Sequence, residues 1–385
     1  MQEYDFVIAG GGGAGLGLAN ALLDSAQNQA SILLIDKASQ KQNDRTWCFW
    51  GPPSAPFAGL AAHSWQKIAI VSEKGPNVID LGDWRYWMVR GIDYYRTIQR
   101  RLEAAPTIHF RQGSIDRIVE NGSRALVQVG SETVSTRWAF DSTLGPNDLV
   151  IDAEHYHPIK QHFKGWEIET GHDMFDPACA TLFDFRTPQP DGLHFFYILP
   201  TAPHRALVEY TVFSANLLTD KQYRGTLQDY IANVLNLSDY QIISEENGVI
   251  PMTDQPFVRR AGLHVLNIGT KGGLVKPSTG YAFARMQRDA IAIAASLDRF
   301  GHPFAIPRSP ARYRLFDSIL LQLIYRRGPL MAPIFTRLFE RNPIRRVFHF
   351  LDEDAAPWED AALIATLPPG PFLQALLKLV LTRKV

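Results

Sequence analysis

The first 36 residues show short apolar runs separated by turn-forming and helix-forming residues. Residues 4–9 and 31–35 are apolar runs of strand length, and residues 16–25 between them have the composition of a helix. Short apolar runs bounded by glycine or acidic residues are typical of buried strands. We therefore predict a β-α-β unit at the start of the chain, with Asp36 closing its second strand.

The rest of the chain is predicted to be rich in strands first and in helices later. Apolar runs and alternating patterns predict strands at residues 68–72, 77–81, 180–185, 193–199, 206–212 and 265–269. Glycines divide residues 108–140 into short strands, with a hairpin turn at Asn121-Gly122. Helices are predicted at residues 94–102, 227–235 and 279–300. After residue 301 the pattern is helical, with breaks at prolines.

Composition and charge narrow the classes of protein to which this chain can belong. Its 385 residues exceed what one hydrophobic core usually serves, so two linked domains are expected. Lysine plus arginine equals aspartate plus glutamate at 39 each, which argues against a nucleic-acid partner. The two cysteines, Cys48 and Cys179, cannot form a disulfide framework and favour a reducing cytoplasm. No signal peptide is expected, and no apolar run reaches the roughly 18 residues of a spanning helix.

The glycine-rich stretch after the first strand has the spacing of a dinucleotide-binding loop. Gly10, Gly12 and Gly15 form the pattern Gly-x-Gly-x-x-Gly between a predicted strand and a predicted helix. Such glycines allow a tight turn, let the backbone approach a pyrophosphate, and let the helix pack on the strand. Because strand, loop, helix and second strand are all in register, dinucleotide binding is favoured over a fortuitous glycine turn.

The residues around this loop complete the predicted nucleotide site. Gly13 and Ala14 lie at the start of the helix, whose free N–H groups and dipole favour a phosphate. Asp36 is placed to accept the ribose hydroxyls and disfavours the 2′-phosphate of NADP. Lys37 follows directly and is included among the binding candidates.

A second nucleotide-like segment far downstream favours FAD over NAD. Residues 267–283 contain the end of a predicted strand, a glycine loop and a helix expected to start near Ser278 or Thr279. A helix start there would create a second anion site. In two-domain flavoproteins of this plan, that helix N-terminus faces the pyrimidine end of the isoalloxazine. The candidate flavin-binding residues of this segment are Gly269, Thr279, Gly280 and Tyr281.

Several stretches outside the glycine loop resemble the bacterial lycopene β-cyclase family. The discriminating stretches are residues 44–50 (DRTWCFW), 164–170 (KGWEIET), 206–211 (ALVEYT), 246–252 (ENGVIPM) and 276–283 (KPSTGYAF). Residues 338–342 and 350–353 match as well, so the resemblance covers nearly the whole chain. Flavin hydroxylases usually carry Gly-Asp where this chain has Gly269-Thr270. This difference argues against a flavin hydroxylase.

The resemblance implies an α/β fold, a Rossmann-like two-domain FAD flavoprotein of the hydroxylase and glutathione-reductase type. Residues 1–75, 90–150 and 250–300 are then expected to form a discontinuous FAD-binding domain. Residues 76–89 and 151–249 are expected to form a β-sheet substrate domain, and residues 301–385 a helical C-terminal cap.

The family implies a cyclisation without net electron transfer. An acid protonates the terminal double bond of a ψ end of lycopene, the neighbouring double bond attacks the tertiary cation, and a base removes a proton to leave a β-ionone ring. The expected products are γ-carotene and then β-carotene. Since no hydride is transferred, the reduced FAD that the family requires is expected to serve as a negative charge or as a proton carrier. NAD(P)H is the expected reductant.

Two glutamates are the candidate catalytic residues. Glu209 lies between apolar neighbours in an alternating strand, and the resemblance implies that it is essential. Burial would raise its pKa, so that it could carry a proton at neutral pH; an outward-pointing carboxylate is the alternative. Glu246 is the second candidate, with a strand-end or ribose-facing acid as its alternative role. Glu167 and Glu169 are expected to be structural.

The motif at residues 44–50 adds Thr46 and Trp47 to the cofactor-binding candidates. Aromatic side chains of the matching motifs could line a polyene tunnel and offer π faces to a cation, namely Trp47, Phe49, Trp50, Tyr281 and Phe283. Three histidines, His155, His157 and His162, lack the partners of an ordered metal site, so no metal is predicted.

The C-terminal region combines basic and apolar residues. Residues 301–350 carry nine arginines against two acidic residues, with apolar stretches interleaved. This pattern and the amphipathic residues 372–381 predict helices on an anionic membrane surface; a soluble cap with a solvated basic face is the alternative. Because lycopene lives in the bilayer, we expect a cytoplasmic protein peripherally bound to the inner face of the cell membrane.

Two other functions stay open on the sequence. An FAD-dependent monooxygenase or reductase acting on another isoprenoid would consume NAD(P)H stoichiometrically, whereas a cyclase needs reductant only catalytically. A non-catalytic carotenoid or flavin carrier would not depend on Glu209.

Overall fold

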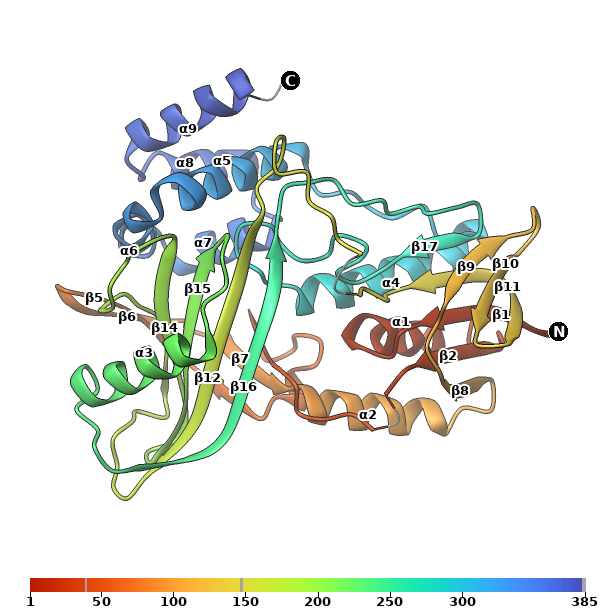
Figure 1. Cartoon of the computed structure of the whole chain (residues 1–385), viewed down its shortest axis with the longest axis horizontal. Coiled ribbons are helices and arrows are strands. Elements are labelled where there is room, and N and C mark those ends of the chain that lie inside the picture. The colour runs from red at the N-terminus through yellow and green to blue at the C-terminus, as the bar shows by residue number, and fades with distance from the viewer. Residues whose placement is uncertain (39, 146–147, 383–385) are drawn as a thin grey trace.

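The computed structural model describes residues 1–38, 40–145 and 148–382 and contains two large β-sheets (Figure 1). The strands of the first sheet are β1 (Gln2–Ala9), β2 (Ile32–Asp36), β8 (Ile108–Gln112), β9 (Arg117–Glu120), β10 (Ala125–Val129), β11 (Glu132–Asp141) and β17 (Val265–Asn267). They are ordered β8-β2-β1-β11-β10-β9, with β17 beside β11. The parallel core of this sheet, β8, β2, β1 and β11, is the part that carries the glycine loop.

The predicted β-α-β unit forms the centre of the first sheet. β1 and β2 pair in parallel, with Phe6 opposite Ile32, and α1 (Gly13–Leu23) connects them. α1 packs against α2 (Gly91–Glu103) and α4 (Phe283–Phe300), and Figure 1 shows α1 between these two helices. The small residues of α1 allow this close packing, and Phe6, Ile8, Ile32 and Leu34 of β1 and β2 are buried in the core that they share with α1.

The second sheet is made of long strands whose two faces pack against different parts of the chain. Its strands are β5 (Lys67–Ser72), β6 (Gly75–Asp80), β12 (Ile159–Thr170), β13 (Cys179–Asp184), β14 (Leu193–Ala202), β15 (Arg205–Ser214) and β16 (Tyr240–Met252). They are ordered β16-β12-β15-β14-β13-β5-β6. One face packs its apolar residues, such as Val208 and Phe196, against α3 (Asp220–Asn233). The opposite face carries Leu207, Glu209 and Thr211, as the alternation along β15 requires.

A small third sheet joins the two halves of the molecule. It consists of β3 (Thr46–Gly51), β7 (Arg85–Arg90) and β4 (His63–Trp65), with a short 3₁₀ turn η1 (Ala58–Leu60) before β4. Phe49 and Val89 on one face belong to the core of the first domain. Tyr86 and Met88 on the other face belong to the core of the second sheet.

The remainder of the chain forms a helical cap. It consists of α5 (Ala311–Arg327), η2 (Gly328–Leu330), α6 (Met331–Arg341), α7 (Ile344–Asp352), α8 (Pro357–Ile364) and α9 (Pro369–Thr382). These helices, blue in Figure 1, cover one end of the second sheet, and α9 lies at the outer edge. Apolar residues of α5, α6 and α7 share one core with β5, β13 and β14.

Three boundaries differ from those expected from the sequence. The pattern places β5 in the first domain, but it pairs with β13 and β6, because Ile68 and Ile70 face the core shared with the cap. The long helix begins at Phe283 and not at Thr279, because Gly280 has a φ of +75° that ends any helical path there. α3 spans Asp220–Asn233 instead of residues 227–235, since Thr219 forms a capping box at its start.

Candidate active site

Three adjacent strands of the second sheet bring the two predicted catalytic glutamates together. β12 lies between β15 and β16, and its Gly165 is opposite Glu209 on one side and Glu246 on the other. A Cβ atom at Gly165 would lie 3.3 Å from Cβ of Glu209 and 3.2 Å from Cγ of Glu246. The two acidic side chains therefore meet over the space that the glycine leaves.

Both carboxyl groups lie where ionisation is disfavoured. Glu209 is only 8% exposed and accepts a hydrogen bond from Thr211 Oγ1 at 2.8 Å. Burial, and after it the charge of Glu246, raises the pKa of Glu209 well above its usual range. Burial also raises the pKa of Glu246, which accepts a hydrogen bond from Thr46 Oγ1 at 2.8 Å. The interaction between the two carboxyl groups raises the pKa of Glu209 and lowers that of Glu246, so it favours the proton on Glu209.

Four polar side chains from other elements surround this acid pair. They are Cys48 on β3, Tyr86 on β7, Tyr197 on β14 and Tyr281 in the loop before α4. Tyr197 is directly opposite Glu209 in the β14–β15 pair, and the hydroxyls of Tyr86 and Tyr281 are 3.3 Å apart. Burial raises the pKa of Tyr281 to about 12, and it likewise raises the pKa of the Cys48 thiol, so both groups stay neutral.

Within the described residues, no cation balances the acid pair. Among the ion pairs of residues 1–38, 40–145 and 148–382, none includes Glu209 or Glu246, whereas the neighbouring Glu245 pairs with Lys164 and Arg224. A buried carboxyl group without a cation is held in its protonated form. The site is thus a buried carboxyl group that keeps its proton next to tyrosine side chains.

The aromatic residues predicted to line one tunnel divide between two regions, because side chains alternate along β3. Trp47 and Phe49 face the first domain, and Trp47 stacks on Phe283 with ring centroids 5.0 Å apart. Trp50 lies on the other face of β3, where it stacks on Phe348 of the cap and contacts Tyr281 edge-on at 4.9 Å. Of the predicted set, only Trp50 and Tyr281 therefore belong to the surroundings of the acid pair.

The glycine loop has the geometry predicted for phosphate binding. Gly10 has a φ of +96°, which favours glycine. A Cβ at Gly15 would lie 1.9 Å from the Gly10 carbonyl oxygen, so α1 can pack this closely on the loop only because residue 15 is glycine. In the described part of the chain, nothing lies within 4 Å of a Cβ built on Gly12. α1, whose residues are all described, has no side-chain cap and no acid in its first turn. Its N-terminal N–H groups therefore fit an anion.

The acid at the end of β2 lies against this loop. Asp36 accepts hydrogen bonds from the backbone N–H of Gly11 at 2.5 Å and from Lys41 Nζ at 2.8 Å. Against the effect of burial, the hydrogen bonds from Lys41 and Ala38 lower the pKa of Asp36, which stays ionised. Lys37 is exposed, and Lys41, which the sequence pattern did not single out, is the lysine that contacts Asp36.

The downstream segment packs directly against the glycine loop. Gly269 has a φ of +62°, and a Cβ there would lie 2.9 Å from Cβ of Ala14. Thr279 and Gly280 lie in a turn, where the N–H of Gly280 donates to the Lys276 carbonyl at 2.9 Å. A Cβ at Gly280 would lie 1.9 Å from Oε1 of Gln161, a buried acceptor without a donor among the described residues. A bound group with an N–H could satisfy it, so the two segments together fit a flavin dinucleotide.

A buried ion cluster ties this segment to the cap. Lys276 Nζ lies 3.0 Å from Asp317 on α5 and 2.9 Å from Glu353 after α7, and Arg285 lies 2.9 Å from Glu353. Ser278 donates to Asp317 at 2.5 Å. Although burial opposes ionisation, Lys276 and Arg285 lower the pKa of Glu353 to about 2. The loop at residues 276–281 is therefore held against the cap by ion pairs.

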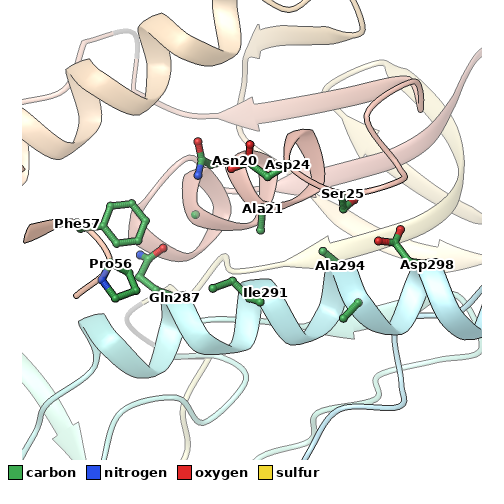
Figure 2. A pocket seen from close by; sticks show the side chains of 12 residues that line it. Asn20, Ala21, Asp24, Ser25, Pro56, Phe57, Gln287, Ile291, Ala294 and Asp298 are labelled. Carbon is green, nitrogen blue, oxygen red and sulfur yellow. The ribbon is translucent and has the colours of Figure 1, made fainter. Parts of the chain in front are cut away.

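Two other features lie outside the acid site. A surface groove of about 440 Å³ runs between α1 and α4, with Phe57 at one end and Asp298 at the other (Figure 2). Its lining includes neither catalytic candidate. The histidines noted in the sequence have separate partners: His155 contacts Asp152, His157 contacts Asp254 and Gln322, and His162 contacts Ser214 and Tyr223.

Sequence reasoning missed three members of the acid site, namely Cys48, Tyr86 and Tyr197. The alternation along residues 193–199 places Tyr197 on the same face as Phe195 and Leu199, which identifies the face but not its partner. Cys48 and Tyr86 reach the site only because the small third sheet packs against the second, and no local signal in the sequence predicts that contact.

The overall fold is that of two-domain FAD-dependent enzymes. The chain is similar to a geranylgeranyl bacteriochlorophyll reductase-like protein from Thermoplasma acidophilum, with a TM-score of 0.62 and 13% identity over 98% of this chain and 100% of that one. A flavin-dependent brominase matches with a TM-score of 0.60 and 16% identity, covering 91% of this chain and 94% of the other. At these identities the likeness shows the fold, and it confirms the predicted fold class.

The chain belongs to the family described as lycopene cyclase protein, whose sequence model matches residues 5–377. A lycopene beta-cyclase of Pantoea ananas is 24% identical over the full length of both chains. A lycopene beta-cyclase of Pseudescherichia vulneris is 26% identical, covering 76% of this chain and 74% of the relative. The resemblance inferred from the motifs is thereby confirmed.

Proposed function

We propose that this chain is an FAD-dependent lycopene β-cyclase that closes the ψ ends of lycopene, through γ-carotene, to the β-ionone rings of β-carotene. Family membership supports the substrate class. The observation that carries the proposal is Glu209, a buried carboxyl group that holds its proton without a cation and faces tyrosine rings. Protonating an alkene requires a group that still carries its proton at neutral pH and is shielded from water, and the carbocation that follows must also be kept from water.

The residues around Glu209 suit each stage of such a reaction. Glu209 gives its proton to the terminal double bond, and the resulting tertiary cation is attacked by the neighbouring double bond to close the ring. Trp50 and Tyr281 offer π faces to the cation, and the negative charge left on the acid pair stabilises it. Loss of a proton from the ring carbon completes the product without net oxidation.

The flavin would be held by the glycine loop at Gly10, Gly12 and Gly15 and by the turn at Gly269 and Gly280. When bound in its reduced anionic form, it would supply a negative charge that stabilises the carbocation. The ion cluster at Lys276 holds this turn against the cap. The turn and the acid pair therefore keep fixed positions relative to each other.

The decisive experiment is Glu209→Gln in lycopene-producing cells and as purified protein with reduced FAD. We expect cyclisation to fall by about 10²- to 10⁴-fold, the usual contribution of a positioned acid. Glu245→Gln, which changes an exposed acid on β16, is the matched control and should leave activity unchanged. A carotenoid or flavin carrier would be unaffected by Glu209→Gln, and retained cyclisation in that variant would refute the assigned acid.

NAD(P)H is proposed as the reductant that keeps the flavin reduced. For a cyclase, NAD(P)H oxidation under strict anaerobiosis should be far below one equivalent per ring formed. Of the alternatives acting on another isoprenoid, an FAD-dependent reductase requires one equivalent per product, and an FAD-dependent monooxygenase forms no product without O₂. The ratio of NADPH oxidised to carotenoid formed separates the two.

The cap is proposed to dock on the inner face of the cell membrane, where the substrate resides. Along α9, Leu373, Leu377, Val380 and Leu381 are each more than half exposed and follow a helical spacing of one face. Among the described residues, no single helix is long and apolar enough to span a bilayer; α8 and α9 reach that composition only as a pair bent by 115°. Exposed Arg326 and Arg327 at the end of α5 could meet anionic lipid.

A further inference from the structure

The acid pair depends on a glycine in the strand between its two members. β15 and β16 flank β12, so the backbones of Glu209 and Glu246 are two strand spacings apart, roughly 9.5 Å. Only the side chains can meet, and they do so over Gly165. Any other residue at position 165 would place its Cβ between them.

Two threonines hold the pair in its orientation. Thr211 donates to Oε1 of Glu209, and Thr46, from the third sheet, donates to Oε2 of Glu246. Each carboxyl group thus has one oxygen fixed by a hydroxyl and one left for its partner. Such a pair shares a single proton, because two neighbouring carboxylates cannot both ionise without a cation.

We propose that Glu209 and Glu246 form a one-proton pair that is both the acid and the base of the cyclisation, with Glu209 as the catalytic residue and Glu246 as the positioning residue. This inference rests on the proposed function and adds the identity of the base. It also gives Gly165 a role in the reaction, as the position that lets the pair form.

The proton balance of the cycle closes within the pair. The O–H bond of Glu209 breaks as the C–H bond forms at the terminal alkene, which leaves two negative carboxylates beside the carbocation. After the ring closes, the C–H bond on the ring carbon next to the cation breaks, and its electrons form the new double bond. That proton returns to Glu209, so the pair regains its starting state and no oxidant or reductant is consumed.

The groups that face the pair favour this cycle. Cys48, Tyr197 and Tyr281 face Glu209 and are neutral. Glu167, which is paired with Arg205, and Asp44, which is paired with Arg45, lie on the side of Glu246 and raise its pKa. These groups keep a proton in the pair. Glu246 is only partly buried and lies on the edge strand β16, which suits it to hold the negative charge while Glu209 holds the proton.

The first test is Glu246→Gln, which removes the charge and keeps the shape. We expect kcat to fall about 100-fold, with Glu209 still present, and the alkaline limb of the pH profile of kcat to move to lower pH. The limb moves in that direction because Glu209 loses the negative neighbour that helps to retain its proton. Glu245→Gln on the same strand is the control and should change neither quantity. Unchanged kcat and pH profile in Glu246→Gln would overturn the pair.

The second test does not depend on turnover. The infrared spectrum of the protein should contain a protonated carboxyl band that is absent in Glu209→Gln and shifted in Glu246→Gln and Gly165→Ala. If lycopene is not cyclised at all but these band changes occur, the proposed function fails and the shared proton stands. If Glu209→Gln abolishes cyclisation but Glu246→Gln leaves the band in place, the acid stands and the pair fails. Thr46→Val, which leaves the strand contacts intact, serves where Gly165→Ala does not fold.

Discussion

Two of the buried acidic sites among the described residues contain a glutamate in opposite protonation states. At the acid pair, Glu209 and Glu246 meet over Gly165 beside tyrosines, and burial raises the pKa of both. At the ion cluster, Glu353 is equally buried but contacts Lys276 and Arg285, and its pKa is lowered to about 2. The two sites lie on opposite sides of the loop at residues 276–281.

The difference teaches that counter-charge, and not burial alone, decides what a buried carboxyl group does. Without a cation it keeps a proton and can act as an acid. With a cation it is ionised and serves as a tie between segments. Both arrangements meet at one loop, because Tyr281 faces the acid pair and Lys276 faces the cap. Four predictions follow this contrast from the largest expected effect to the smallest.

Removing the cation from the ion cluster should be severely destabilising. Lys276→Met leaves Asp317 buried without its lysine and Glu353 with only Arg285, so we expect a loss of about 3–5 kcal/mol in the free energy of unfolding. Chemical denaturation of the purified protein measures it. Lys271→Met, in the same loop, removes a more exposed ion pair with Asp141 and should cost about 1 kcal/mol or less. Equal losses of unfolding free energy in the two variants would show that the buried ion cluster is no more important than the exposed ion pair.

Acid should weaken the ion cluster in a defined pH range. Because the folded-state pKa of Glu353 lies near 2, below its ordinary value of 4.5, its contribution is present above pH 4.5 and is lost as pH falls towards 2. The loss amounts to about 3 kcal/mol. Unfolding free energies of wild type and Glu353→Gln, measured from pH 6 to pH 3, should converge; parallel curves would reject the assignment.

The contribution of Glu209 to the free energy of unfolding should change with pH in the direction opposite to that of Glu353. The folded-state pKa of Glu209 is raised, so the folded state binds the proton more tightly, and this stabilisation is lost as pH rises above the unfolded value. Glu209→Gln keeps the shape without the charge and should stabilise the protein by about 0.5–2 kcal/mol, as at many functional sites. The gain should be larger at pH 8 than at pH 5. If the gain in unfolding free energy of Glu209→Gln does not change with pH, the raised pKa assigned to Glu209 is wrong.

The smallest effect on stability is expected at the outer face of the cap. Leu373→Ser with Leu377→Ser changes exposed side chains, so unfolding should change by less than about 0.5 kcal/mol. Binding to vesicles that contain anionic lipid should nevertheless fall by at least about tenfold, because two apolar anchors are lost. The control pair Val258→Ser and Leu263→Ser, exposed apolar residues elsewhere, should bind like wild type. Equal binding by all three proteins would count against membrane docking by α9.

The elements that sequence patterns predicted best are those whose signals are local. The β-α-β unit, the loop at Gly10 and the helix over residues 94–102 follow from apolar spacing and glycine placement, and all three are confirmed. The alternation around Glu209 left open whether its carboxyl group points outward or is buried, and the structure buries it. The start of α4 was not predictable from composition, because it depends on the left-handed conformation of Gly280 against Gln161 on a distant strand.

By itself, the sequence determined the nucleotide loop, the two-domain plan and the family, because these depend on neighbouring residues and on motifs that can be read along the chain. Only the tertiary structure decided which acids are protonated. Glu246 joins Glu209 through strand register, Tyr86 and Cys48 arrive from the third sheet, and Lys276 finds Asp317 and Glu353 in the cap. The physical reason is that a pKa depends on burial and on charges that distant segments bring within a few ångströms, and no local pattern records those distances.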